Sequence, residues 1–197
     1  PGAAQSADDL FNDQALQRID LWVNTRDWYL MRARPDDSSY YPANLKWNGI
    51  TVTNVAIRMK GTASRSPVKP ALRVDFNRYA TGRTFLGLTA ISLNNLWQDA
   101  SGLRELLAMK TYRTLGLPAS RVAPVALYVN NTYAGFYLAV EDIEEPFLAR
   151  AFGESSGYLF EYKWITNYYF DYLGADLEPY AAMYEPKTRE AESKGSL

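Results

Sequence analysis

Apolar and polar side chains alternate along much of the chain, and this alternation predicts half-buried strands. The first such run covers residues 19–23, and capping side chains at 24–27 then introduce a short helix over 28–33. Asn48-Gly49 separates two alternating runs and indicates a hairpin, because both turn positions require positive φ. The pattern therefore predicts strands over 45–47, 50–52, 55–60 and 72–76.

The apolar residues between 101 and 115 recur at helical spacing. Ser101 or Asp99 can cap this main helix, and Gly116 and Pro118 stand where a helix should stop. We expect its inner face to consist of Leu103, Leu106, Leu107, Met109, Tyr112 and Leu115.

A second hairpin is predicted from residues 125–129 and 133–140. A short helix at 147–152 and a strand at 157–162 follow, whereas the hydrophobic periodicity fades from about Pro179 onward. Hairpin-linked strands around one long helix predict an α+β fold, in which an antiparallel sheet carries one main packed helix.

Composition excludes several kinds of chemistry, because the 197 residues include neither histidine nor cysteine. Disulfides, thiolate nucleophiles, the usual zinc and iron–sulfur sites, imidazole bases and the Ser-His-Asp triad are all ruled out. A net charge of −1 argues against nucleic acid as a partner. The chain has no apolar run of about 18 residues, so we expect no membrane span. It starts at Pro1, and we expect a secreted or cell-surface protein whose signal peptide has been removed.

A basic segment between positions 58 and 73 contains no acidic residue and five cations, namely Arg58, Lys60, Arg65, Lys69 and Arg73. The small residues at 61–66 lie between two strands here, and such residues let backbone N–H groups converge on an anion. The segment fits a phosphate cradle. It also fits a flexible hairpin loop beside a solvated strand, and its spacing matches neither a P-loop nor a dinucleotide fingerprint.

Glu105 lies one turn into the main helix, downstream of the strand that begins near Lys69. A strand lysine paired with a helix glutamate holds nucleotide phosphates in kinase-type lobes. Lys69 and Glu105 are therefore candidate catalytic residues. The alternative is that they are two unrelated surface charges, and exposed pairs contribute little to stability.

Several blocks of sequence, in this order and spacing, resemble the CotH (spore-coat protein H) family of atypical secretory protein kinases. The resemblance runs from about residue 10 to 165 and is carried by residues 55–61 with Ser64, 69–76, 85–88, 99–105, 116–119, 127–137, Glu141 and 147–159.

This resemblance implies a bacterial kinase with a kinase-like small lobe, ATP and Mg²⁺ as cofactors, and Ser phosphorylation of extracellular or coat proteins. Lys60, Gly61 and Ser64 would form the phosphate loop, and Lys69 would hold phosphates under the orientation of Glu105. The remaining implied nucleotide-binding residues are Arg58 and Arg73, which would support the site, and Glu141, which would lie near the connection between lobes.

The chain departs from the family pattern in its acidic residues, because no metal ligands are found in the sequence. Asp171 and Asp176 lie in an aromatic segment without the spacing of kinase metal ligands. We therefore expect a polar lead at 1–9, a first lobe at 10–165, and a truncated or loosely ordered end at 166–197. Without the second lobe we expect nucleotide binding with little or no kinase activity, and self-association through apolar surface that a second lobe would cover.

Two other functions fit some of the residues. A carbohydrate- or protein-binding module could use stacking faces at Trp22, Trp28, Trp47, Trp97, Trp164 and 168–172, although core packing is the usual role of Trp and Trp22 is the strongest candidate for it. A carboxylate-pair glycosidase could use Glu141, Asp142, Glu144 and Glu145, although such a run more often begins a solvated helix.

Overall fold

The computed structural model describes residues 4–62, 64–163 and 168–188. The chain divides into two compact units, residues 1–143 and residues 144–197. Each unit is considered by itself below.

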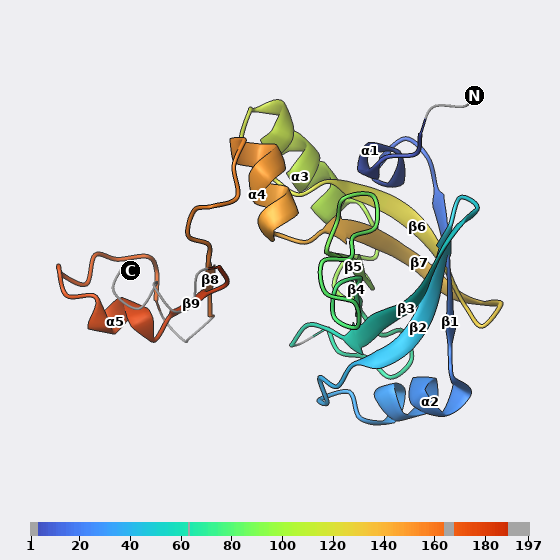
Figure 1. The fold of residues 1–197 in the computed structure, drawn as a ribbon. Coiled ribbons are helices and arrows are strands. Elements are labelled where there is room, and N and C mark those ends of the chain that lie inside the picture. Colours follow the sequence, from blue (N-terminus) through green and yellow to red (C-terminus); the bar gives the residue numbers. More distant parts are fainter. Residues whose placement is uncertain (1–3, 63, 164–167, 189–197) are drawn as a thin grey trace. The chain divides into compact units, whose positions relative to one another are not determined.

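Seven strands of the first unit close into a barrel (Figure 1). In order around the barrel they are β1 (Gln17–Val23), β2 (Tyr41–Trp47), β3 (Ile50–Met59), β4 (Leu72–Asp75), β5 (Ala90–Asn94), β7 (Thr132–Glu141) and β6 (Val122–Val129). Adjacent strands are antiparallel except at the closing seam, where β1 and β6 run parallel with Gln17 opposite Val125.

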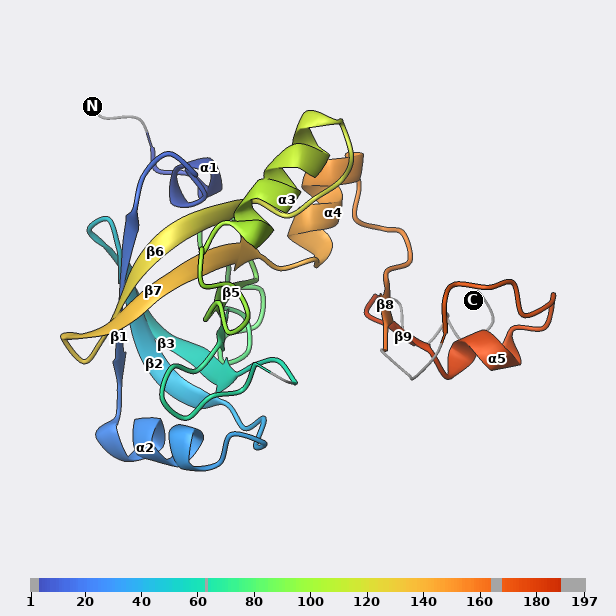
Figure 2. The ribbon, with the colours of Figure 1, turned by 180° about the vertical axis from the view of Figure 1, so that it is seen from behind.

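The core lies inside this barrel, because alternate side chains of the strands point inward. Ile19, Leu21 and Leu45 are among the fully buried side chains. Two short helices, α1 (Ala7–Leu10) and α2 (Thr25–Ala33), lie at opposite ends of the barrel (Figures 1 and 2). Leu10 of α1 and Met31 of α2 are buried in the same core.

Both predicted hairpins are confirmed, since β2 pairs with β3 and β6 pairs with β7 in antiparallel register. The turn residues have positive φ, 44° and 84° at Asn48 and Gly49 and 49° and 65° at Asn130 and Asn131. The sequence predicts separate strands over 50–52 and 55–60. The structure instead has the single strand β3, which ends at Met59 and contains Asn54 at a φ of 52°.

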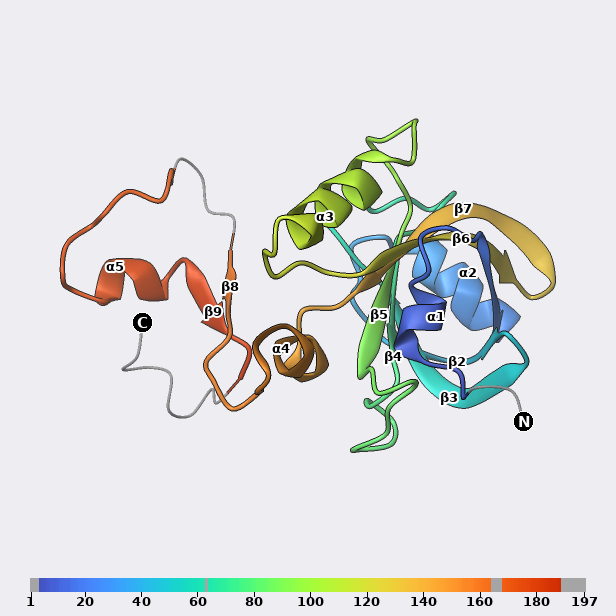
Figure 3. The same cartoon turned by 90° about the horizontal axis from the view of Figure 1, so that it is seen from above.

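The expected α+β fold with one main packed helix is wrong, because this unit is a mixed β-barrel. The helix α3 (Arg104–Thr114) lies outside the barrel, along β6 and β7 (Figure 3), and has no buried residue. Leu106 and Met109 contact the outer side chains of these strands, while Leu107 and Leu115 are 53% and 69% exposed.

The helix α3 stays outside because the inward-pointing strand residues already fill the barrel. A closed barrel has no open sheet face that a helix must cover. The start of α3 also differs from the expected Ser101. The carboxylate of Asp99 accepts the backbone N–H of Arg104 at 2.8 Å, which places the first helical turn three residues later.

The second unit contains α4 (Glu145–Phe152), α5 (Glu178–Ala181) and a two-stranded antiparallel sheet of β8 (Phe160–Tyr162) and β9 (Tyr184–Pro186). The helix α4 confirms the helix expected at 147–152 and ends at Gly153 in the left-handed conformation. Elements α5 and β9 form in a segment where hydrophobic periodicity is weak. Among the described residues of both units, no helix is long and apolar enough to span a membrane.

Candidate functional site

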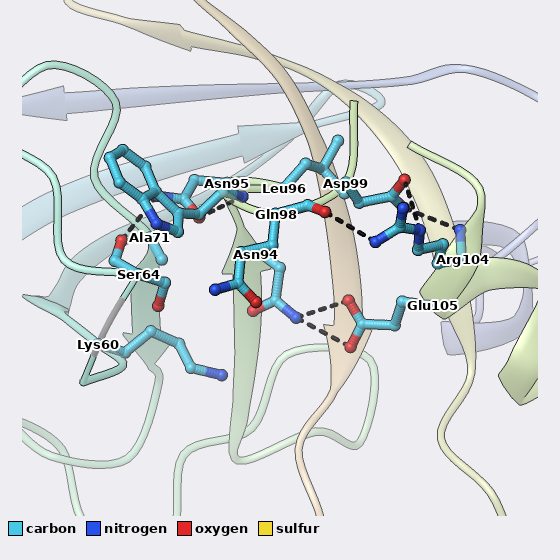
Figure 4. A pocket seen from close by; sticks show the side chains of 11 residues that line it. Lys60, Ser64, Ala71, Asn94, Asn95, Leu96, Gln98, Asp99, Arg104 and Glu105 are labelled. Carbon is cyan, nitrogen blue, oxygen red and sulfur yellow. Dashed lines mark hydrogen bonds and ion pairs between the residues drawn. The ribbon is translucent and has the colours of Figure 1, made fainter. Parts of the chain in front are cut away.

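A pocket of about 550 Å³ opens in the first unit, between the end of β3, the end of β5 and the start of α3 (Figure 4). It is lined by Lys60, Ser64, Ala71, Asn94, Asn95, Leu96, Trp97, Gln98, Asp99, Arg104 and Glu105. The polar lining consists of three side-chain amides, one hydroxyl, the cations of Lys60 and Arg104 and the carboxylates of Asp99 and Glu105, which suits a polar ligand.

Lys60 is the cation that the fold holds most firmly in this pocket. It directly follows β3, and its backbone N–H donates to Ala71 at 2.9 Å, which extends the β3–β4 ladder by one residue. Its ammonium donates to the hydroxyl of Ser92 at 2.7 Å, and this hydroxyl donates to the carboxylate of Asp142. Arg73 donates to the other oxygen of the same carboxylate.

Burial lowers the pKa of Lys60 below its ordinary value of 10.5, because the charged ammonium has lost much of its water. The negative charges of Asp142 and Glu105 oppose this shift, and the positive charges of Arg73 and Arg58 add to it. An ammonium can donate three hydrogen bonds, and Ser92 accepts one from Lys60. An anion in the pocket would favour the charged ammonium and so oppose this lowering of the pKa.

Glu105 reaches the pocket from the first turn of α3. The side-chain nitrogen of Asn94, at the end of β5, donates to both of its carboxylate oxygens at 2.9 and 2.7 Å. Figure 4 shows Asn94 between Glu105 and Lys60. The strand lysine that shares a pocket with the helix glutamate is therefore Lys60.

Gly61, Ser64 and Arg65 follow β3 and contact one another. A Cβ on Gly61 would lie 2.0 Å from the hydroxyl oxygen of Ser64 and would displace it, and the φ of 91° at Gly61 favours glycine. Arg65 donates to the carbonyl of Gly61 at 2.5 Å and to the carbonyl of Pro35 at 2.8 Å. These bonds tie the loop to the segment before β2.

Lys69, which the sequence pairs with Glu105, lies apart from the pocket lining. Its ammonium sits 5.1 Å from the ring centroid of Tyr137, and its stem passes close to Gly135. Burial lowers the pKa of Lys69. The structure thus brings Lys60 and Ser64 together with Glu105 and gives Lys69 a different environment.

Three further candidates have defined partners. Arg58 donates to the hydroxyl of Tyr40 at 3.0 Å, on the outer side of the barrel wall. Arg73 binds Asp142 and so supports Lys60 indirectly. Glu141 is 1% exposed and accepts from the guanidinium of Arg121 at 2.7 Å, away from the pocket lining.

Sequence reasoning missed the polar residues that organise the pocket from behind. Two features of the sequence could have indicated these residues. Ser92 stands between apolar residues, and Asn95 directly follows Asn94. Asn95 is buried, and its side-chain nitrogen donates to the carbonyls of Ser64 and Lys69 at 2.8 and 2.7 Å. In the sequence, Asp142 stands out only as part of an acidic run.

The structure also shows which of the candidate tryptophans are buried and which are exposed. Trp47 is in the barrel core, and Trp22, interpreted as a core residue, points outward from β1 and is half-buried. Trp97 is 59% exposed at the pocket. Trp164 lies outside the described residues.

The donor set fits phosphate better than it fits a metal ion. Lys60 and Ser64 can both donate to phosphate oxygens, whereas the guanidinium of Arg104 donates to the carbonyl of Gln98 at 2.9 Å. Within residues 4–62, 64–163 and 168–188, no group of three or more acidic side chains could hold a metal.

One pocket on the barrel wall thus gathers Lys60, Ser64 and Glu105 from three separate parts of the chain. The family model described as CotH kinase protein matches residues 57–196, more than half of the chain, so this chain belongs to that family. Its curated relatives include the inner spore coat protein H of Bacillus subtilis (strain 168), which is 25% identical over 139 residues. That match covers 71% of this chain and 37% of the relative, so the chain spans well under half of the relative's length.

Proposed function

We propose that residues 1–143 bind the phosphate groups of ATP in the pocket around Lys60, as the nucleotide-binding part of a CotH kinase. The family name supports ATP as the ligand. The proposal is confined to nucleotide binding, because the described residues gather no acidic cluster for the metal that assists phosphoryl transfer.

The observation that carries the proposal is the anchoring of Lys60. Its ammonium is part-buried in an open pocket, and the Ser92–Asp142–Arg73 network fixes its position from behind. A lysine held in this way is a preorganised point charge for a phosphate oxygen. Ser64 lines the same pocket, and its hydroxyl is a second donor.

Glu105 and Asn94 would adjust the pocket to the ligand. The carboxylate of Glu105 opposes the shift of the Lys60 pKa and so favours the charged ammonium. Asn94, which lies between them, can turn its amide toward a ligand oxygen while Glu105 approaches Lys60.

We further propose a coat or surface location for this protein. The support is the name of its Bacillus subtilis relative, an inner spore coat protein. A surface or coat protein would then be the substrate of the complete kinase.

The test is isothermal titration of the 197-residue protein with ATP, with and without Mg²⁺, and with inorganic tripolyphosphate. We expect saturable binding of both triphosphates. Ligand at a hundredfold excess over Kd should also stabilise the folded protein by about 2.7 kcal/mol in thermal unfolding. Lys60→Met should weaken binding at least tenfold, since it removes the anchored charge.

Lys46→Met is the matched control, because Lys46 is exposed on the outer face of β2. It should leave the affinity within twofold of the parent. Equal affinities for the parent and Lys60→Met, or no triphosphate binding by a folded parent, would contradict the proposal.

A further inference from the structure

A second pocket, of about 420 Å³, lies on the outer face of the barrel and shares no lining residue with the pocket around Lys60. Its lining consists of Arg18, Asp20, Trp22, Lys46, Asn48, Gly49 and Asn131. These residues belong to β1, β2 and the turns of the two hairpins. The volume falls within the range of roughly 300–1,000 Å³ that is usual for small-ligand sites.

The alternation of β1 sets three of these side chains in one row. Ile19 and Leu21 are fully buried in the core, so Arg18, Asp20 and Trp22 point to the outside of the barrel. The step of four residues from Arg18 to Trp22 covers about 13 Å along the strand. The row is therefore long enough to follow a ligand of two linked rings, and the paired strand fixes its spacing.

Trp22 is the aromatic member of this row, and it is half-buried. Its indole N–H has no hydrogen-bond partner within the part of the chain that the structure describes, and it is not enclosed. By contrast, the indole N–H of the core residue Trp47 donates to Gln17 at 2.9 Å. A partly exposed indole with a free N–H can both stack on a ligand and donate to it.

Arg18 and Asp20 are held in a fixed geometry beside Trp22. Nε of Arg18 donates to both carboxylate oxygens of Asp20 at 3.2 and 3.0 Å, and Nη2 donates to one of them at 2.8 Å. The guanidinium carbon also lies 4.0 Å from the ring centroid of Tyr128. Arg18 and Asp20 thus cancel each other's charge, which makes the pocket polar without making it strongly charged.

Lys46 adds one cation to the pocket, and it has no ion-pair partner among the described residues. One uncompensated cation is too few to define a site for a polyanion, whose recognition depends on several charge-assisted hydrogen bonds. The pocket therefore suits a ligand that is uncharged and rich in hydrogen-bonding groups.

The side chains of Asn48 and Asn131 supply such groups. Both are exposed, and neither side-chain amide has a hydrogen-bond partner in the described ranges. Each amide carries two donors and one acceptor oxygen. Groups of this kind match the hydroxyls of a sugar ring, each of which donates and accepts, while the C–H face of the ring can stack on an indole.

We infer that this outer pocket is a second binding site, which takes an uncharged oligosaccharide with one pyranose ring stacked on Trp22. The Arg18–Asp20 pair and the two asparagines bond to its hydroxyls. The site does not depend on nucleotide binding, because the two pockets have no residue in common. The first unit would then hold a glycan on the outside of the barrel whether or not its nucleotide pocket is occupied.

The experiment is titration calorimetry of the 197-residue protein with cellotetraose, maltotetraose and chitotetraose, accompanied by tryptophan fluorescence. We expect saturable binding of at least one of the three, with a change in emission. Sorbitol carries hydroxyls but no ring, and it should not bind. Trp22→Ala should weaken the binding about tenfold or more, as the loss of a central aromatic contact does.

Two milder variants keep the test valid if Trp22→Ala does not fold. Trp22→Phe should retain most of the affinity and lose most of the emission change, since it keeps a stacking ring without the indole. Asn131→Gly should weaken binding, because it removes one amide while glycine accommodates the φ of 65° at this turn.

Tyr29→Ala is the control for loss of an exposed aromatic ring, because Tyr29 is 69% exposed on α2 and lines neither pocket. It should bind the oligosaccharide like the parent, and Trp22→Ala should keep the parent's Kd for ATP. The inference is wrong if none of the three oligosaccharides binds the folded parent, if sorbitol binds equally well, or if the Trp22 variants bind and respond like the parent. Loss of the nucleotide proposal would leave Trp22-dependent sugar binding unaffected.

Discussion

The ammonium of Lys60 and the carboxylate of Asp142 are linked through one hydroxyl, that of Ser92, which accepts from Lys60 at 2.7 Å and donates to Asp142. Lys60 follows β3, Ser92 lies in β5 and Asp142 follows β7, so the link spans three parts of the barrel wall. Its members come from distant parts of the sequence and meet only when the barrel closes.

Ser92→Ala should therefore lower both stability and phosphate affinity. The substitution leaves a part-buried ammonium and a part-buried carboxylate without the group between them, which costs about 1–3 kcal/mol of unfolding free energy. Urea denaturation measures this loss, and calorimetry with tripolyphosphate measures the affinity. An Ala variant as stable as the parent would show that the hydroxyl has no bridging role.

The lowered pKa of Lys60 predicts a pH dependence of stability with a definite sign. Between the folded pKa of Lys60 and its ordinary value of 10.5, the unfolded chain binds more protons than the folded one. The unfolding free energy contributed by Lys60 should thus rise with pH in that window, and phosphate affinity should fall as the ammonium is lost. Other groups titrate there too, so the observable is the difference between the parent and Lys60→Met. A flat difference curve would contradict the shift.

Gly61→Ala should disturb the loop at 61–66 more than a glycine replacement elsewhere. The new Cβ would meet the hydroxyl of Ser64 at 2.0 Å, and φ at Gly61 is 91°. Gly82→Ala is the matched control, since Gly82 has a φ of 79° and nothing within 4 Å of the added Cβ. Both variants should lose about 1 kcal/mol from backbone strain. Only Gly61→Ala should also weaken tripolyphosphate binding, and equal affinities for the two variants would oppose a role for the loop.

Glu141→Gln separates structural from ligand-binding roles. Glu141 is buried against Arg121, and removing one charge of a buried pair costs about 3 kcal/mol. We expect lower stability in urea and an unchanged Kd for ATP among the molecules that remain folded. A much weaker Kd would instead support the position that the sequence resemblance assigns to Glu141 beside the nucleotide.

The outer position of α3 can be checked with two leucines one residue apart. Leu106 contacts the outer cluster on β6 and β7, whereas Leu107 is 53% exposed. Leu106→Ala should cost about 2 kcal/mol of unfolding free energy, and Leu107→Ala should stay within about 0.5 kcal/mol of the parent. Similar losses at the two positions would mean that the helix buries the broader face expected from sequence.

Local patterns predict local features of this chain well. The Asn48-Gly49 turn, the strand at 19–23 and the helix at 147–152 all depend on neighbouring residues, and the structure confirms them. The parallel pairing of β1 with β6 is not visible in any window of sequence, because its partners are roughly a hundred residues apart. The fold class was therefore wrong although most strands were placed correctly.

The same distinction applies to the candidate site. Lys60, Ser64 and Glu105 could be found from residue type and spacing, and they do line one pocket. The pairing of β3 with β4 decides which lysine shares the pocket with Glu105. The alternation of apolar and polar residues does not reveal this pairing, so it cannot show that the lysine is Lys60 and not Lys69. Ser92 and Asp142 carry no motif, since their role exists only through contact in the closed barrel.

The closing seam of the barrel also determines how the chain can be shortened. The family match starts at residue 57, whereas β1, β2 and most of β3 precede it. Trimming to the matched segment would remove β1, the partner of β6, and β2, the partner of β3, leaving edges with unpaired backbone groups. Such edges invite intermolecular pairing. The folding unit of this protein therefore begins some forty residues before the stretch by which its family is recognised.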